Sequence, residues 1–80
     1  MVYVYVLQSL VDNGYYVGIG KDLVVRLKKH NRGGVRSTKN RKPFKLIYSE
    51  ELENYSMARK REKELKSYKG GNLFKELIDI

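Results

Sequence analysis

The chain has 80 residues, with 17 Lys and Arg against 9 Asp and Glu, so its formal net charge is +8 at pH 7. Cysteine is absent and histidine occurs once, which excludes disulfides, thiol catalysis, zinc–thiolate centres and multi-histidine metal sites. No apolar run reaches the roughly 18–20 residues of a membrane span, and no secretory signal pattern opens the chain. We therefore expect one cytoplasmic domain spanning residues 1–80, away from membranes, with a polyanionic partner.

The first part of the chain predicts a hairpin followed by a helix. Residues 1–7 are β-branched and aromatic after the initial Met, without a polar break, which is typical of a strand buried on both faces. An Asp-Asn-Gly turn at 12–14 separates them from a second strand at 15–19, so the two should pair antiparallel. Asp22 then suits the N-cap of a helix that runs to about Asn31.

The middle of the chain is a basic loop. Residues 31–43 contain five cations and no acid, a glycine pair and almost nothing apolar. Such a segment binds phosphate backbones without sequence preference, because its affinity comes from released counterions. The candidate nucleic-acid-binding residues are Arg32, Arg36, Lys39, Arg41 and Lys42.

A third strand and a long helix follow the loop. Residues 44–49 predict the strand, and the helix should run from about Tyr55 to Tyr68. Asn54 or Ser56 suits its N-cap, and the glycine pair at 70–71 suits its end.

Residues 73–78 carry apolar side chains at helical spacing, which predicts a short final helix. The elements then follow in the order β-β-α-β-α-α. This order indicates an α+β domain, in which helices cover a small antiparallel sheet of three strands.

Tyrosine is the first residue type that suggests a site, since it occurs seven times. Tyr3 and Tyr5 share one face of the first strand, and the hairpin can bring Tyr5 near Tyr15 or Tyr16. A single tyrosine on a sheet is most often there for packing. Two phenols that converge on one face are more informative, because each buried hydroxyl needs a partner.

Arg26 and His30 stand four residues apart on the first helix, at the margin of an apolar stripe formed by Leu23, Val24 and Leu27. They should point towards the same spot. A lone histidine is more often a packed or surface residue than a catalyst. An arginine beside it favours a phosphate site, because a guanidinium matches phosphate with two parallel hydrogen bonds.

Glu62 falls within the expected buried stripe of the long helix, which runs through Tyr55, Ala58, Leu65 and Lys69. A carboxylate on a core-facing side is costly unless a cation or metal compensates it. Two interpretations stay open from the helix alone. Glu62 forms a salt bridge to a cation such as Arg26, or it holds a metal at the floor of a site.

Taken together, these residues resemble the GIY-YIG nuclease domain family. Tyr-Val-Tyr at 3–5 and Tyr-Val-Gly at 16–18 resemble its two tyrosine motifs. The stretch 18–31 resembles the family's arginine-bearing helix, and 56–69 the helix of its metal-binding glutamate. The resemblance covers essentially the whole chain, as in the small single-domain members. The first motif lacks its glycine, Val17 replaces an isoleucine, and Gly20 stands where small members often carry threonine or serine.

The resemblance implies a three-stranded antiparallel sheet flanked by helices and a Mg²⁺- or Mn²⁺-dependent endonuclease that hydrolyses phosphodiester bonds. DNA is favoured over RNA, and repair or recombination is the compatible setting. Tyr5 would be the general base, with its pKa lowered by a nearby cation, or would position the water, and Tyr16 would orient the phosphate. Arg26 would stabilise the transition state, and His30 would relay the proton or orient the nucleophile. Glu62 would be the metal ligand.

Two alternatives use the same composition. The first is a catalytically silent nucleic-acid-binding domain on this fold, and the second is a module whose positive charge recruits an acidic protein. Glu62 separates the first from an enzyme, because a binder of polyanions gains nothing from a carboxylate in its phosphate-facing cleft. The sequence leaves the oligomeric state open.

Overall fold

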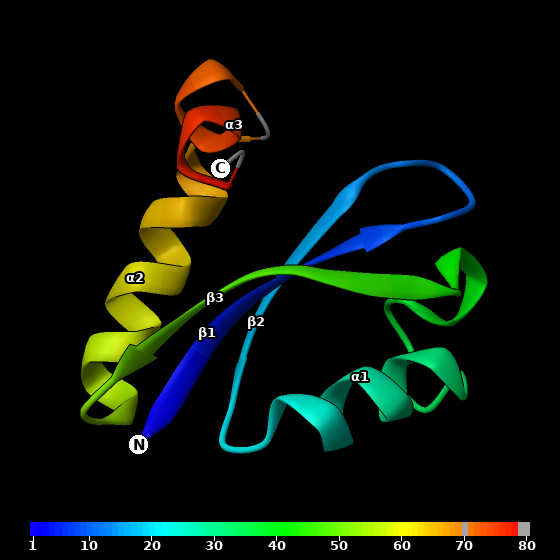
Figure 1. Ribbon diagram of the computed structural model, residues 1–80, viewed down its shortest axis with the longest axis horizontal. Helices are drawn as coiled ribbons and strands as arrows, with labels where there is room; N and C mark the ends of the chain where they lie inside the picture. The colour runs from blue at the N-terminus through cyan, green and yellow to red at the C-terminus, as the bar shows by residue number, and fades with distance from the viewer. Residues whose placement is uncertain (70, 79–80) are drawn as a thin grey trace.

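A computed structural model describes residues 1–69 and 71–78, and shows a three-stranded antiparallel sheet with helices on both sides (Figure 1). The strand order is β2-β1-β3, which confirms the expected α+β class and element order. No helix among these residues is long and apolar enough to cross a membrane. The elements are β1 (Val2–Ser9), β2 (Tyr15–Gly20), α1 (Leu23–Asn31), the 3-10 helix η1 (Lys39–Arg41), β3 (Phe44–Leu52), α2 (Tyr55–Ser67) and α3 (Asn72–Ile78).

Strand β1 is the centre of the sheet and is buried on both faces, as its unbroken apolar sequence predicts. Its side chains alternate between two separate cores. Val2, Val4 and Val6 point to the side covered by α2 and α3, whereas Tyr5 and Leu7 point to the side covered by α1. One face of β1 therefore packs into the core beneath α2 and α3, and the other face contributes Tyr5 to the candidate site.

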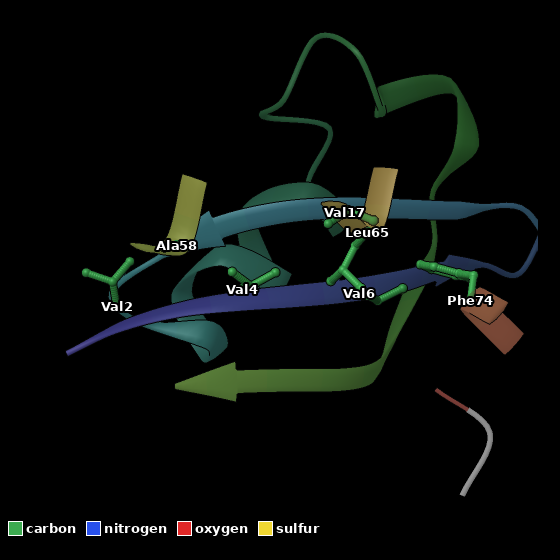
Figure 2. Close-up of a cluster of buried hydrophobic side chains, with 7 residues drawn as sticks. All are labelled: Val2, Val4, Val6, Val17, Ala58, Leu65 and Phe74. Atoms are coloured by element: carbon green, nitrogen blue, oxygen red, sulfur yellow. The ribbon is translucent and has the colours of Figure 1, made fainter. Parts of the chain in front are cut away.

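The core beneath α2 and α3 is aliphatic (Figure 2). Ala58, Leu65 and Phe74 pack against the valines of β1 and β2. Tyr55 is 40% exposed, so the buried stripe of α2 is narrower than expected. Of its predicted members, Ala58 and Leu65 are the ones that reach the core, and they are seven residues apart, which is two helical turns.

Helix α2 ends within one residue of its predicted end. It stops at Ser67, and Lys69 then takes a left-handed backbone conformation with φ of 52°. The glycine pair that was expected to end the helix follows at positions 70–71, and Gly70 lies outside the described residues. The role usually filled by glycine at a helix end therefore falls to a lysine.

Both predicted N-caps are confirmed. The Asp22 carboxylate accepts a hydrogen bond from Val25 N–H at 3.1 Å, and Asn54 Oδ1 accepts one from Met57 N–H at 2.9 Å. The predicted apolar stripe of α1 is wrong at Val24, which is 63% exposed. The arc of α1 that faces the sheet is rotated away from Val24, and this rotation carries His30 to its centre.

The segment between α1 and β3 is tied to the rest of the fold at several points. The Asn31 side chain accepts from Phe44 N–H at 2.6 Å and donates to Phe44 O at 3.1 Å, which joins the end of α1 to the start of β3. Ser9 Oγ–H donates to Arg41 O at 2.6 Å, and Thr38 is fully buried. Strand β3 continues to Leu52, three residues beyond the predicted end.

Candidate active site

Three side chains that were predicted to converge do so on the α1 face of the sheet. The rings of Tyr5 and Tyr16 lie 6.5 Å apart, and the His30 ring lies 6.1 Å from Tyr5 and 4.8 Å from Tyr16. Tyr15 faces the opposite side and packs against Phe74 at 5.0 Å. Of the two tyrosines considered as partners for Tyr5, the structure selects Tyr16.

His30 is buried, with 1% of its surface exposed, and both ring nitrogens have partners. Nδ1 lies 2.8 Å from Thr38 Oγ1, and the Thr38 hydroxyl donates to Val35 O at 3.3 Å. Because the single hydroxyl proton of Thr38 is used there, its oxygen accepts from Nδ1–H. This network assigns a free lone pair to Nε2, which accepts from the Tyr5 hydroxyl at 3.2 Å.

Burial dominates the electrostatics of this pair. Desolvation lowers the pKa of His30, and the positive charges of Arg26 and Lys29 lower it further. Desolvation also raises the pKa of Tyr5 above its ordinary value, and the opposing charge of Arg26 is the smaller effect. The expectation that a nearby cation lowers the tyrosine pKa is therefore wrong, and Tyr5 is a neutral phenol bonded to a neutral imidazole.

Two glycines of β2 make room for this arrangement. Tyr5 pairs with Gly18 across the sheet, and a Cβ at Gly18 would lie 2.5 Å from the Tyr5 hydroxyl oxygen. A Cβ at Gly20 would lie 2.9 Å from Arg26 Cγ and Nε. The absence of a side chain at Gly20 thus lets the Arg26 side chain pack directly against the β2 backbone.

Arg26 is half-buried and only partly satisfied. Its Nη2 donates to Ile19 O at 3.1 Å, which fixes the guanidinium against the end of β2. Its Nε is buried and has no hydrogen-bond partner among the described residues. An unsatisfied buried N–H is costly, and a guanidinium held in this way suits an incoming anion such as a phosphate.

Glu62 pairs with a cation, as one of its two interpretations expects, and that cation is a lysine of its own helix. The Glu62 side chain is 22% exposed and lies 3.2 Å from Lys66 Nζ, one turn along α2, rather than against Arg26. Its negative charge also contributes to the raised pKa of the Tyr5 hydroxyl, although Glu62 comes from the helix on the other side of the sheet. Tyr5 and Arg26 lie on the α1 side of the sheet, whereas Glu62 belongs to α2 on the other side.

The residues present suit some metals and not others. No group of three or more His, Asp or Glu side chains that could hold a metal occurs among residues 1–69 and 71–78. A single half-buried carboxylate does not make a zinc site, which needs three or four protein ligands. It does suit Mg²⁺ or Mn²⁺, because Mg²⁺ keeps several waters and takes one or two carboxylates together with substrate phosphate.

The basic loop divides into two groups. Arg41 is committed to the hairpin, since its Nε lies 2.9 Å from the Asp12 carboxylate and holds the pKa of that carboxyl at about 2. Its guanidinium also lies over the Phe44 ring, 5.6 Å from the centroid. Arg41 was predicted to contact phosphate, but in the structure it stabilises the hairpin by pairing with Asp12. The other four candidates, Arg32, Arg36, Lys39 and Lys42, are exposed.

Sequence reasoning missed two functional candidates. Lys66 stands at i+4 from Glu62, a spacing that typically forms an ion pair on a helix, so that contact could have been found. Thr38 could not, because its partner His30 reaches it only after the loop folds back over α1.

The chain is similar to known proteins over most of its length. The GIY-YIG catalytic domain matches residues 1–74. A UPF0213 protein of Staphylococcus aureus strain Mu3 is 45% identical over 67 residues, which cover 82% of this chain and 80% of that protein, and UPF0213 protein SA0446 of strain N315 gives the same values. The solution NMR structure of UPF0213 protein BH0048 from Bacillus halodurans is 32% identical, covers 92% of both chains and has a TM-score of 0.49.

Proposed function

The chain belongs to the GIY-YIG catalytic domain family, and from this premise we propose that it is a metal-dependent endonuclease that hydrolyses phosphodiester bonds, with DNA favoured over RNA. The family is one of nucleases, which makes nucleic acid the substrate class. The observation that carries the finer proposal is the buried hydrogen-bonded pair of Tyr5 and His30, to which we add Arg26 and the part-buried carboxylate of Glu62. Phosphodiester hydrolysis requires a base, a cation for the developing charge and a metal ligand.

Arg26 is assigned to the phosphate. Its guanidinium is anchored by one N–H on Ile19 O, and the buried Nε has no partner among the described residues. A phosphate oxygen that accepts from the accessible part of the Arg26 guanidinium would place positive charge where negative charge develops in the transition state. Tyr16, which is half-buried beside His30, is the phenol assigned to orienting the phosphate.

The Tyr5–His30 pair is assigned to proton transfer. A water attacks phosphorus and its proton passes to the Tyr5 oxygen, while the Tyr5 proton passes to His30 Nε2. The bond from phosphorus to the leaving oxygen breaks with its electron pair on that oxygen, which takes a proton from solvent water, and His30 is left as an imidazolium held by Thr38. No phenolate forms, which agrees with the raised pKa of Tyr5. Because Tyr5 is almost wholly enclosed, the attacking water has to lie directly against its hydroxyl, beside Arg26.

Glu62 is the residue that would hold Mg²⁺ or Mn²⁺, with the remaining ligands supplied by water and a substrate phosphate oxygen. A bound ion of this kind supplies charge neutralisation at the phosphate. Lys66 Nζ lies 3.2 Å from one of the two Glu62 oxygens, so a metal at this carboxylate would either share it with the ammonium or displace the ammonium. With a single carboxylate, we expect metal and substrate to bind together rather than separately.

The same contact favours the second candidate, a catalytically silent nucleic-acid-binding domain. In a silent domain, Glu62 stays paired with Lys66 and binds no metal, and the buried Tyr5–His30 pair only stabilises the fold. The two readings differ in what removal of the Glu62 charge does, because a silent binder gains affinity for a polyanion when a carboxylate is lost.

The test is a cleavage assay on supercoiled plasmid and on labelled single-stranded, duplex and branched DNA and RNA, with Mg²⁺ or Mn²⁺ against EDTA. Glu62→Gln and Arg26→Ala are purified in parallel, with Glu53→Gln as the control, since Glu53 is an exposed carboxylate just before α2. We expect metal-dependent cleavage that is lost in the first two variants and kept in the third. Cleavage in none of the proteins, with tighter binding by Glu62→Gln, would favour the silent domain.

A further inference from the structure

A groove of about 720 Å³ runs along the free edge of β2, between the hairpin and the ends of α2 and α3. Its walls include two tyrosines of β2 and three lysines of the helical ends, namely Tyr15, Tyr16, Lys66, Lys69 and Lys75. No Asp or Glu is among the lining residues that the structure describes. In a protein of net charge +8, this is a concave surface of one sign, where the field attracts anions most strongly.

The groove adjoins both halves of the candidate active site. Tyr16 forms part of its wall and also packs against His30, with ring centroids 4.8 Å apart. Lys66 forms part of the opposite wall and pairs with Glu62 at 3.2 Å. A ligand lying in the groove therefore ends beside the proton-transfer pair on one side and the carboxylate on the other.

Lys69 has a feature that packing does not explain. Its φ of 52° lies in the left-handed region, where glycine is favoured and a β-carbon is strained. Its side chain is exposed and makes no ion pair among the described residues. The position does place an ammonium group at the groove.

We propose that this groove holds one strand of nucleic acid that flanks the bond to be cut, with Lys69 and Lys75 contacting its phosphates along a wall that includes Tyr15. A groove of this volume matches sites that enclose a drug-sized molecule, so it fits a few nucleotides of one strand and not a duplex. Aromatic side chains beside cations are typical of single-strand binding. The position of the cut bond rests on the proposed function, whereas the binding does not.

The experiment measures binding of a fluorescein-labelled single-stranded DNA by anisotropy, in EDTA and over a series of salt concentrations. The variant is Lys69→Gln with Lys75→Gln, and the matched control is Lys60→Gln with Lys63→Gln, two exposed lysines of α2 that do not line the groove. Each phosphate contact on a single strand contributes about 0.7 to the slope of log K against log salt. Loss of two contacts therefore lowers that slope by about 1.4 and weakens binding roughly 25-fold at 0.1 M salt.

A third variant, Lys69→Gly, separates binding from folding. Glycine relieves the left-handed backbone at this position, so thermal stability should be kept while binding weakens. Equal losses in the groove and control pairs, no loss in either, or no binding by the wild type would each overturn the proposal. Because binding is measured in EDTA, groove-dependent binding without any cleavage in the assay above would disprove the nuclease proposal and leave the groove standing.

Discussion

His30 Nε2 lies 3.2 Å from the Tyr5 hydroxyl, and both side chains are removed from solvent. The other ring nitrogen of His30 is bonded to Thr38, which fixes the tautomer so that the lone pair faces the tyrosine. A histidine inside an otherwise apolar cluster needs both partners satisfied to remain neutral and ordered. The same two bonds that satisfy it also aim a base at the hydroxyl of the first tyrosine motif.

The fall in cleavage rate at low pH should follow the protonation of His30. The pKa of His30 is lowered by burial and by neighbouring cations, and only the neutral ring can accept the Tyr5 proton. We expect the single-turnover rate to fall with decreasing pH at a midpoint below about 6.5, the ordinary value for histidine. His30→Gln should remove this fall and slow cleavage by about 100-fold or more. An unchanged fall in His30→Gln would show that another group titrates.

Thr38 should act as a positioning residue. Thr38→Val removes the acceptor of the Nδ1–H bond, so the tautomer is no longer held and the bond to the imidazolium is lost. We expect a rate loss of about tenfold or more at unchanged KM, with the acid midpoint moved to lower pH. Thr38→Ser keeps the hydroxyl and should restore both. If Ser and Val variants cleave equally, the hydroxyl has no part in the proton path.

Gly18→Ala and Gly20→Ala should separate stability from activity. A Cβ at Gly18 collides with the enclosed Tyr5 ring, so we expect destabilisation of about 1–3 kcal/mol together with loss of cleavage. A Cβ at Gly20 meets the Arg26 side chain, which can move, so cleavage should fall with a smaller change in stability. Thermal unfolding and cleavage rates of both variants provide the comparison, and equal stability losses would contradict it.

The Asp12–Arg41 pair should govern stability at low pH. Arg41 holds the pKa of the Asp12 carboxyl at about 2, below its value in the unfolded chain. The unfolded state therefore binds the proton first, and the stabilisation is present above about pH 4 and is lost as the pH falls towards 2. Denaturant unfolding between pH 2 and 6 should show a shallower pH dependence for Asp12→Asn than for the wild type. Identical pH dependences would mean that the pair contributes nothing.

Much of the fold follows from the sequence because local signals agree there. The unbroken apolar run of β1 and the caps at Asp22 and Asn54 each specify one element, and all are found in the structure. The convergence of Tyr5 with Tyr16 follows from strand alternation and the hairpin register.

What could not be predicted depends on how helices are rotated against the sheet. A nine-residue helix with few apolar positions does not fix which arc is buried, and so Val24 was assigned to the core and His30 only to its margin. The partner of Glu62 was left open between a cation such as Arg26 and a metal, although the i, i+4 spacing to Lys66 is visible in the sequence. Thr38 and the β2-edge groove arise from tertiary contacts, for which a single sequence carries no periodic signal.

The central claim is that one carboxylate, Glu62, holds the metal of a nuclease. The most direct measurement is single-turnover nicking of supercoiled plasmid as a function of Mg²⁺ concentration, for the wild type and for Glu62→Gln. The account predicts saturable, Mg²⁺-dependent nicking by the wild type and none by Glu62→Gln at any Mg²⁺ concentration, while both proteins bind the plasmid. Nicking that persists in EDTA, or in Glu62→Gln with the same Mg²⁺ dependence, would contradict it.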